Sequence, residues 1–346
     1  MAHRSGRRSS SGRRYISGND MSSETDDYRI RQRELTAPSG SFQESRVLEK
    51  GELLLFRIFD EYLLLMSESA AMKDRISHFL GSLKTPISNS VRTTTRLAIF
   101  EAPNDHVVLC CPECGVAQTV TLLPTAWFVF RRLLLHLVVN MERPHFPLHA
   151  CCVVNKNGDA AVISGLSGSG KTSVTAALLR RGYHFAVDDY AMLLPDGFVL
   201  AFPLGSTISQ RTFTLLPDIE PLKSPLRQLS NTDSGIWIAN LGQIFPIVKA
   251  FTLLRPTHFF FLMPGFGAQS SLEPCSTEES LWHLQAARLA DRRMVKPLKR
   301  TSPKHYDMGL GIAQKLVHEA GFFRVVNGDL NTTAALIAAA FESDPR

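Results

Sequence analysis

The chain has 346 residues, of which 44% are hydrophobic, so it can bury a sizeable core in one large or two moderate domains. Its formal net charge is +6, but residues 1–20 hold five arginines against one aspartate, which leaves the rest nearly neutral. This distribution excludes a broad basic face on the folded part, and we therefore expect no nucleic-acid partner.

Residues 1–45 are rich in Ser, Arg and Gly and poor in apolar residues, which predicts a disordered basic tail. Residues 1–19 have the composition of a transit peptide, but they lack the apolar face of an amphipathic helix. Met21 is an alternative start, and the choice between Met1 and Met21 stays open. No secretory signal is recognisable, so we expect a cytoplasmic protein.

Residues 46–141 have the pattern of an α+β N-terminal region. Its apolar window at 122–139 is interrupted by Pro124 and by the Arg131–Arg132 pair, which favours a buried or amphipathic helix over a membrane span. The segments predicted here are a hairpin of 53–58 with 62–66, a helix at 72–83, strands at 93–100, 106–109 and 118–123, and a helix at 125–141.

The six cysteines follow no regular disulfide framework, which favours reduced thiols and agrees with a cytoplasmic protein. They are Cys110, Cys111, Cys114, Cys151, Cys152 and Cys275. Cys111 and Cys114 form a single C-x-x-C pair. A structural zinc site would need a second pair at a suitable distance, and Cys151–Cys152 is poorly spaced for that role.

A histidine opens the next predicted strand, which runs from 148 to 154. This strand should form a hairpin with 161–164, because Asn157-Gly158 between them is a strong turn signal. The hairpin would bring His149 next to the segment that follows residue 164, and this raises its interest above that of an isolated histidine.

That segment matches the phosphate-binding loop pattern G-x-x-x-x-G-K-[ST] in full, between an apolar strand at 160–163 and a helix at 173–181. The glycines let backbone N–H groups face a polyphosphate, and the helix N-terminus adds its dipole. Lys171 can contact the β- and γ-phosphates, and Thr172 can bind the metal ion. The residues expected to bind nucleotide are Gly165, Leu166, Ser167, Gly168, Ser169, Gly170, Lys171, Thr172 and Ser173.

Two adjacent carboxylates, Asp188 and Asp189, end the apolar strand 185–187. In doubly wound sheets such positions face the ligand crevice. One carboxylate can hold magnesium there while the other accepts a proton. The residues alone leave open which aspartate takes which role.

Together, the His149 strand, the phosphate-binding loop, a helix ending in Arg181-Gly182 and the Asp188–Asp189 strand resemble the catalytic core of HPr kinase/phosphorylase and related serine kinases. The resemblance implies an α/β fold shared with phosphoenolpyruvate carboxykinase, in which residues 142–346 form a P-loop core with a mixed sheet. It implies that Asp189 is the acid/base, that His149 and Lys171 belong to the active site, and that Thr172 is a metal ligand. With Asp189 assigned to the proton, we expect Asp188 to be the second metal ligand. Glu220 lies in the general region of the family's later magnesium-binding glutamate, and the loop signature of the reverse reaction is not found.

The second half of the chain alternates strands and helices. Ser276 and Glu279 form a capping box pattern, and Asp329 is a candidate N-cap. The predicted segments are a hairpin of 190–194 with 198–202, a strand at 206–215, a long mobile excursion at 216–246, a strand at 257–263, helices at 274–291 and 307–320, a strand at 322–326 and a helix at 330–341.

The sequence therefore predicts an ATP- and Mg²⁺-dependent kinase that transfers the γ-phosphoryl group to a serine or other hydroxyl of a peptide or small protein. Two alternatives stay open. One is a nucleotide-binding regulator with little transfer activity, and the other is a kinase of a small molecule or a natural-product precursor peptide. The acceptor and the oligomeric state, including a homo-oligomer, are not determined by the sequence.

Overall fold

The computed structural model describes residues 52–58, 61–86, 95–102, 106–111, 116–139, 145–224, 228–230, 235–265, 267, 269–289 and 303–343. The predicted basic tail at 1–45 lies outside the described residues, and so does Cys114. The predictions on the tail and on a zinc site at the C-x-x-C pair therefore stay predictions.

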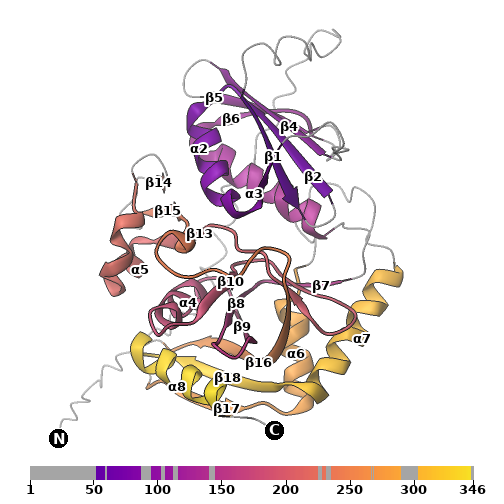
Figure 1. Ribbon diagram of the computed structural model, residues 1–346, viewed down its shortest axis with the longest axis vertical. Coiled ribbons are helices and arrows are strands. Elements are labelled where there is room, and N and C mark those ends of the chain that lie inside the picture. The colour runs from indigo at the N-terminus through magenta and orange to yellow at the C-terminus, as the bar shows by residue number, and fades with distance from the viewer. Residues whose placement is uncertain are drawn as a thin grey trace, which may run out of the picture. The chain divides into compact units, whose positions relative to one another are not determined.

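Among the described residues before 140, six strands form one sheet in the order β3-β1-β2-β4-β5-β6 (Figure 1). The first two strands form the predicted antiparallel hairpin, and β2 pairs with β4 in parallel. Helices α2 and α3 pack on this sheet through buried apolar side chains. The elements are β1 (Glu52–Ile58), β2 (Glu61–Ser67), α2 (Ala70–Phe79), η1 (Gly81–Leu83), β3 (Lys84–Thr85), β4 (Thr95–Ala102), β5 (His106–Cys111), β6 (Val116–Leu122) and α3 (Leu123–Val139).

A nine-stranded mixed sheet follows in the described part of the chain, and it confirms the predicted α/β class. Its main path is β10-β8-β9-β16-β12-β11-β7, while β18 pairs with β16 and β17 pairs with β18. The strand β16 lies parallel to both β9 and β18. The strands are β7 (Phe146–Leu148), β8 (Ala150–Val154), β9 (Asp159–Gly165), β10 (His184–Val187), β11 (Ala191–Leu193), β12 (Val199–Leu200), β16 (Leu253–Pro264), β17 (Ser271–Pro274) and β18 (Gly321–Asn327).

The central strands β9 and β16 each contain a buried apolar run, at 160–163 and 259–262, because both faces of the sheet are covered there. Successive side chains of a strand point to opposite faces. In β16, Phe259 and Phe261 enter one buried cluster, whereas Phe260 and Leu262 enter the other. The two clusters together surround the strand that carries the phosphate-binding loop.

Helices cover both faces of the nine-stranded sheet in the described part of the chain (Figure 1). Helices α4 (Lys171–Leu179) and α8 (Leu330–Glu342) pack together over one cluster, and α6 (Thr277–Ala287) and α7 (Pro303–Glu319) lie over the other. The predicted capping box at Ser276 and Glu279 is present at the start of α6, and the Asp329 side chain caps α8.

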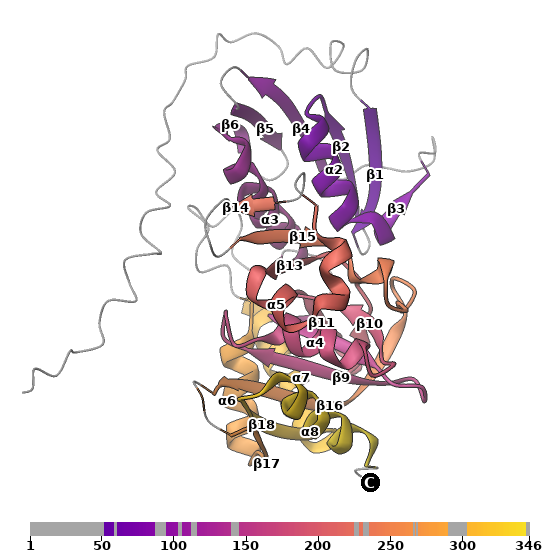
Figure 2. The same cartoon turned by 90° about the vertical axis from the view of Figure 1, so that its left-hand side faces the viewer.

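A third sheet, in the order β13-β15-β14, contacts α2, α3 and α4 (Figures 1 and 2). The prediction of a strand at 206–215 was wrong beyond Ser209, because the Ser209 hydroxyl accepts a hydrogen bond from Thr212 N and caps a helix there. In the described part of 216–246, the expected excursion contains short regular elements. The elements are β13 (Ser206–Ser209), α5 (Gln210–Leu215), η3 (Pro217–Leu222), β14 (Gln228–Ser230), β15 (Ile236–Ala239) and η5 (Leu241–Gln243).

The N-terminal sheet and the nine-stranded sheet share one buried apolar cluster. Trp127 and Phe79 belong to it, together with Phe146 and Phe259. Gly205 N also donates a 2.7 Å hydrogen bond to Phe79 O. The boundary predicted at residue 142 falls among residues outside the described ranges.

In the described part of the chain, no helix combines the length and the apolar character needed to cross a membrane.

Replacing Trp127 with alanine should lower the free energy of unfolding by about 3–5 kcal/mol, because it leaves a large cavity in the shared cluster. Trp127 is fully buried against the Phe79 ring, with centroids 5.0 Å apart. Trp282 on α6 is 65% exposed and provides the control, for which a change within about 0.5 kcal/mol is expected. Denaturant unfolding of both variants tests this, and equal losses would contradict it.

Candidate functional site

Three ends of strands meet at one edge of the nine-stranded sheet. The strand β8 is antiparallel to both of its neighbours, β9 and β10. Its first residue therefore lies at the same edge as the last residues of β9 and β10. His149 precedes β8, Gly165 ends β9 and Asp188 follows β10. The topology thus brings together the three segments that the sequence singles out.

The predicted phosphate-binding loop connects β9 to α4, which confirms the expected strand–loop–helix order. Gly170 is the N-cap of α4 and has a φ of 95°, a conformation that favours glycine. A Cβ atom at Gly170 would collide with the side-chain amide of Asn327. The loop residues Leu166, Ser167 and Gly168 are exposed, so the tip of the loop is open to solvent.

The Lys171 side chain folds back into the loop and is largely buried. Its Nζ donates hydrogen bonds of 2.9 Å to Gly165 O and 3.1 Å to Leu166 O. The loop itself therefore holds the ammonium group next to the backbone that would face a phosphate.

Two residues from distant parts of the chain support the loop, and no sequence pattern pointed to either. Asn327, at the end of β18, donates a 2.7 Å hydrogen bond from Nδ2 to Ser169 O. The Ser173 hydroxyl lies 2.8 Å from the Thr212 hydroxyl of α5. Thr172 precedes Ser173 in the first turn of α4, and it is half-buried.

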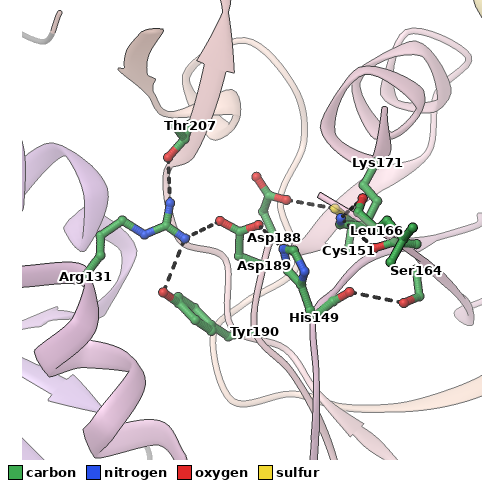
Figure 3. A network of polar contacts seen from close by, with 11 residues as sticks. Arg131, His149, Cys151, Ser164, Leu166, Lys171, Asp188, Asp189, Tyr190 and Thr207 are labelled. Carbon is green, nitrogen blue, oxygen red and sulfur yellow. Dashed lines mark hydrogen bonds and ion pairs between the residues drawn. The ribbon is translucent and has the colours of Figure 1, made fainter. Parts of the chain in front are cut away.

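The two aspartates after β10 occupy different environments, as adjacent residues at a strand end should. Asp188 is buried, and its Oδ1 accepts a 2.8 Å hydrogen bond from Cys151 Sγ. Its Oδ2 is buried without a hydrogen-bond partner among the described residues. Asp189 has a φ of 66°, in the left-handed region, and its carboxylate lies apart from that of Asp188 (Figure 3).

His149 lies between β7 and β8 rather than inside a continuous strand, which corrects the predicted strand 148–154. Its Nε2 is 3.3 Å from Asp189 Oδ1. Its backbone is fixed on both sides, because its N–H donates to Ala287 O and its carbonyl accepts from the Ser164 hydroxyl. The structure therefore places His149 against the carboxylate that the sequence assigns to proton transfer.

Arg131 from α3 completes the group, and sequence reasoning missed this residue (Figure 3). Its Nη2 contacts Asp189 Oδ2 and donates a 3.2 Å hydrogen bond to the Tyr190 hydroxyl. Its Nη1 donates a 2.8 Å hydrogen bond to Thr207 Oγ1. An arginine within the most apolar predicted helix of the N-terminal region is the sequence feature that could have pointed to this role. From the sequence alone, it argued only against a membrane span.

These surroundings separate the two aspartates electrostatically. Burial and the neighbouring Asp189 charge raise the pKa of Asp188 to about 6. Burial alone would raise the pKa of Asp189, but the Arg131 and His149 charges outweigh it and hold this pKa well below its usual range. Burial and Asp188 raise the pKa of the Cys151 thiol, which is therefore a neutral donor. Neighbouring carboxylates with different pKa values suit different tasks.

The residues present fit a magnesium ion that also binds phosphate oxygens. Mg²⁺ usually takes one or two carboxylates from the protein and completes its shell with waters and substrate phosphates. The buried Oδ2 of Asp188 makes no hydrogen bond of normal geometry with the described residues, although the nearby Ser206 hydroxyl lowers the Asp188 pKa, and this oxygen is the candidate ligand. The described residues contain no group of three or more His, Cys, Asp or Glu arranged to hold a metal alone. Glu220 lies in η3, and its Oε1 forms an ion pair with Lys223 Nζ at 3.1 Å, so this glutamate already has a cationic partner.

No protein-family model and no curated protein matches this chain. Among solved structures, part of the chain is similar to the Hpr(Ser) kinase/phosphatase from Coxiella burnetii, at 12% sequence identity and a TM-score of 0.28. The match covers 56% of this chain and 90% of that chain. A TM-score this low supports no inference about activity, so the activity has to be inferred from the chain's own residues.

Gly170→Ala should weaken ATP·Mg²⁺ binding by about tenfold or more, equivalent to about 1.4 kcal/mol. Gly182 provides a matched control, because it also has a φ of 95° but has no atom within 4 Å of an added Cβ. Both variants should lose about 1 kcal/mol of stability from the left-handed conformation. Only Gly170→Ala displaces the Asn327 amide from the loop. Calorimetry with ATP·Mg²⁺ tests the difference, and equal affinities for the two variants would contradict it.

Proposed function

We propose that this protein is a kinase that transfers the γ-phosphoryl group of ATP to a serine or other hydroxyl of a peptide or small protein. The observation that carries the proposal is the convergence of the phosphate-binding loop, the Asp188–Asp189 pair and His149 at one sheet edge. A phosphate-binding loop alone suits many nucleotide-binding proteins. A buried carboxylate pair with separated pKa values beside it favours group transfer.

The loop would bind the polyphosphate through the backbone N–H groups from Gly165 to Ser173 and through the α4 N-terminus. Lys171 would place its charge on the β- and γ-phosphates. Its present hydrogen bonds to two loop carbonyls keep the ammonium beside this backbone before a phosphate arrives. Phosphoryl transfer is favoured mainly by such positioning and charge neutralisation.

Asp189 would accept a hydrogen bond from the acceptor hydroxyl and orient it. Because its lowered pKa makes it a weak base, it would take the proton only as the bond to phosphorus forms and the hydroxyl becomes acidic. Each carboxylate oxygen offers two lone pairs, so the contacts with His149 and Arg131 leave acceptor capacity on both oxygens. His149 would hold the carboxylate in place through Oδ1.

Thr172 and Asp188 would hold Mg²⁺, which supplies positive charge to the phosphate oxygens when bound. In this assignment the Cys151 thiol orients the Asp188 carboxylate through Oδ1 and leaves Oδ2 for the ion.

The motif resemblance to HPr kinase/phosphorylase supports a peptide or small-protein acceptor, with residues 142–346 as the kinase domain and 46–141 as an N-terminal region. We also propose a cytoplasmic location, in agreement with free thiols at Cys110, Cys111, Cys151, Cys152 and Cys275.

Lys171→Ala should abolish nucleotide-dependent activity, because the loop loses its cation for the β- and γ-phosphates. Hydrogen bonds to charged groups contribute about 1.5–3 kcal/mol, so ATP affinity should fall about 10- to 100-fold. Lys156→Ala, in the exposed β8–β9 turn, should leave affinity and turnover unchanged. If Lys171→Ala binds and turns over ATP·Mg²⁺ as the wild type does, the loop does not bind phosphate as proposed.

Asp189→Asn should slow phosphoryl transfer about 10²- to 10⁴-fold, the usual cost of losing a general base. ATP affinity should stay nearly constant, because the loop is unchanged. Calorimetry and an ATP turnover assay on the same preparation separate the two effects. Wild-type turnover would remove Asp189 from the mechanism, whereas complete loss of ATP binding would make it a metal ligand or a structural residue.

Comparing phosphopeptides from cells that express the wild type or Asp189→Asn would identify the acceptor. We expect serine sites that are phosphorylated only with the wild type. If ATP binds but no protein, peptide or small molecule gains phosphate, the chain is a nucleotide-binding regulator instead.

A further inference from the structure

We propose that Arg131 is a positioning residue of the phosphoryl-transfer site, supplied by the N-terminal region to hold the Asp189 carboxylate in its working orientation. This inference rests on the kinase function proposed above. It makes the N-terminal region a part of the active site rather than an appended module.

The guanidinium group is held by three acceptors on two segments of the chain. It contacts Asp189 Oδ2 and the Tyr190 hydroxyl after β10, and Thr207 Oγ1 in β13. The planar fork of an arginine reaches these acceptors from two separate nitrogens in a fixed geometry, whereas a lysine has a single nitrogen for all of its donors. Such a set of contacts fixes the guanidinium in one place, so it can in turn fix the carboxylate.

Aromatic rings pack around the same group. The Arg131 Cζ atom lies 5.6 Å from the centroids of both the Phe79 and the Tyr190 rings. One turn before it on α3, the buried Trp127 packs edge-on against Phe79. The Arg131 side chain is 21% exposed. A transient ion pair would be expected to be solvent-exposed and to rest on one contact. The Arg131 guanidinium is instead enclosed by rings and makes several contacts at once.

Asp189 lies in the short connection between two strands, and side-chain contacts orient its carboxylate. Its φ of 66° takes the backbone out of strand geometry between β10, which ends at Val187, and β11, which begins at Ala191. Two side chains hold its two oxygens separately: His149 lies at Oδ1 and Arg131 at Oδ2. Removing either one would leave the carboxylate free to rotate.

The negative charge of the site is a second reason for an arginine at position 131. Asp188 and Asp189 are adjacent carboxylates, and an incoming nucleotide adds further negative charge. The other cation in contact with Asp189 is His149, which is charged only when protonated. An arginine remains charged at every physiological pH, so it offsets the pair permanently.

The test measures ATP·Mg²⁺ hydrolysis, with water as the acceptor, for the full chain and three variants. Arg131→Ala should lower kcat about 10- to 100-fold, the scale of a 1 Å misplacement in a catalytic group, with KM for ATP unchanged. Arg131→Lys should retain an intermediate rate. Arg180→Ala is the matched control, because it breaks a 2.9 Å arginine–aspartate pair at the surface and should leave kcat unchanged.

Added guanidinium ion at millimolar, non-denaturing concentration should restore part of the rate of Arg131→Ala, and urea should not. A purely structural role would show no such rescue. If Arg131→Ala does not fold, the same comparison of kcat with KM is made with Arg131→Lys.

The outcomes separate the two proposals. A wild type no faster than Lys171→Ala overturns the kinase function, and the role of Arg131 with it. An active wild type with unchanged kcat in Arg131→Ala, or with a loss confined to KM, overturns the role of Arg131 alone. A faster Arg131→Ala would also overturn it and would make the arginine an inhibitory contact.

Discussion

The site depends on placing two carboxylates next to each other at the end of a buried strand. Burying an ionised carboxylate costs several kcal/mol unless hydrogen bonds or opposite charges offset it. The chain handles the two residues differently. Asp188 accepts a hydrogen bond from the neutral Cys151 thiol, and burial raises its pKa, which favours the protonated carboxyl group. Asp189 contacts the Arg131 guanidinium and the His149 imidazole, and its carboxylate stays ionised.

The frame that makes the division possible is the nine-stranded sheet. Because β8 runs antiparallel between β9 and β10, His149 comes to the edge where the phosphate-binding loop and the aspartates emerge. The central strands are held on both faces by apolar side chains, so this edge has a rigid base. The N-terminal sheet belongs to the same arrangement through the apolar cluster that contains Trp127 and Phe79.

Local signals in the sequence predicted much of this. The β8–β9 hairpin, the loop before α4 and the caps of α6 and α8 depend on residues a few positions apart, and the structure confirms them. The strand predicted at 206–215 was wrong because the helix-capping hydroxyl of Ser209 outweighed the apolar pattern. Arg131 and Asn327 could not be predicted, because they act on residues 58 and 158 positions away. Only tertiary packing creates such contacts, and no spacing rule describes them.

The position of β16 has a consequence for synthesis on the ribosome. The strand β9 emerges about a hundred residues before its parallel partner β16, and the Asn327 amide that supports the loop comes later still. Pairing over such separations is slow, because a long loop must close before any contact forms. A nascent chain that already displays Gly165 to Thr172 therefore lacks the neighbours that shape this segment. A nucleotide that binds as proposed above could therefore stabilise the folded loop only after β18, with Asn327, has been synthesised.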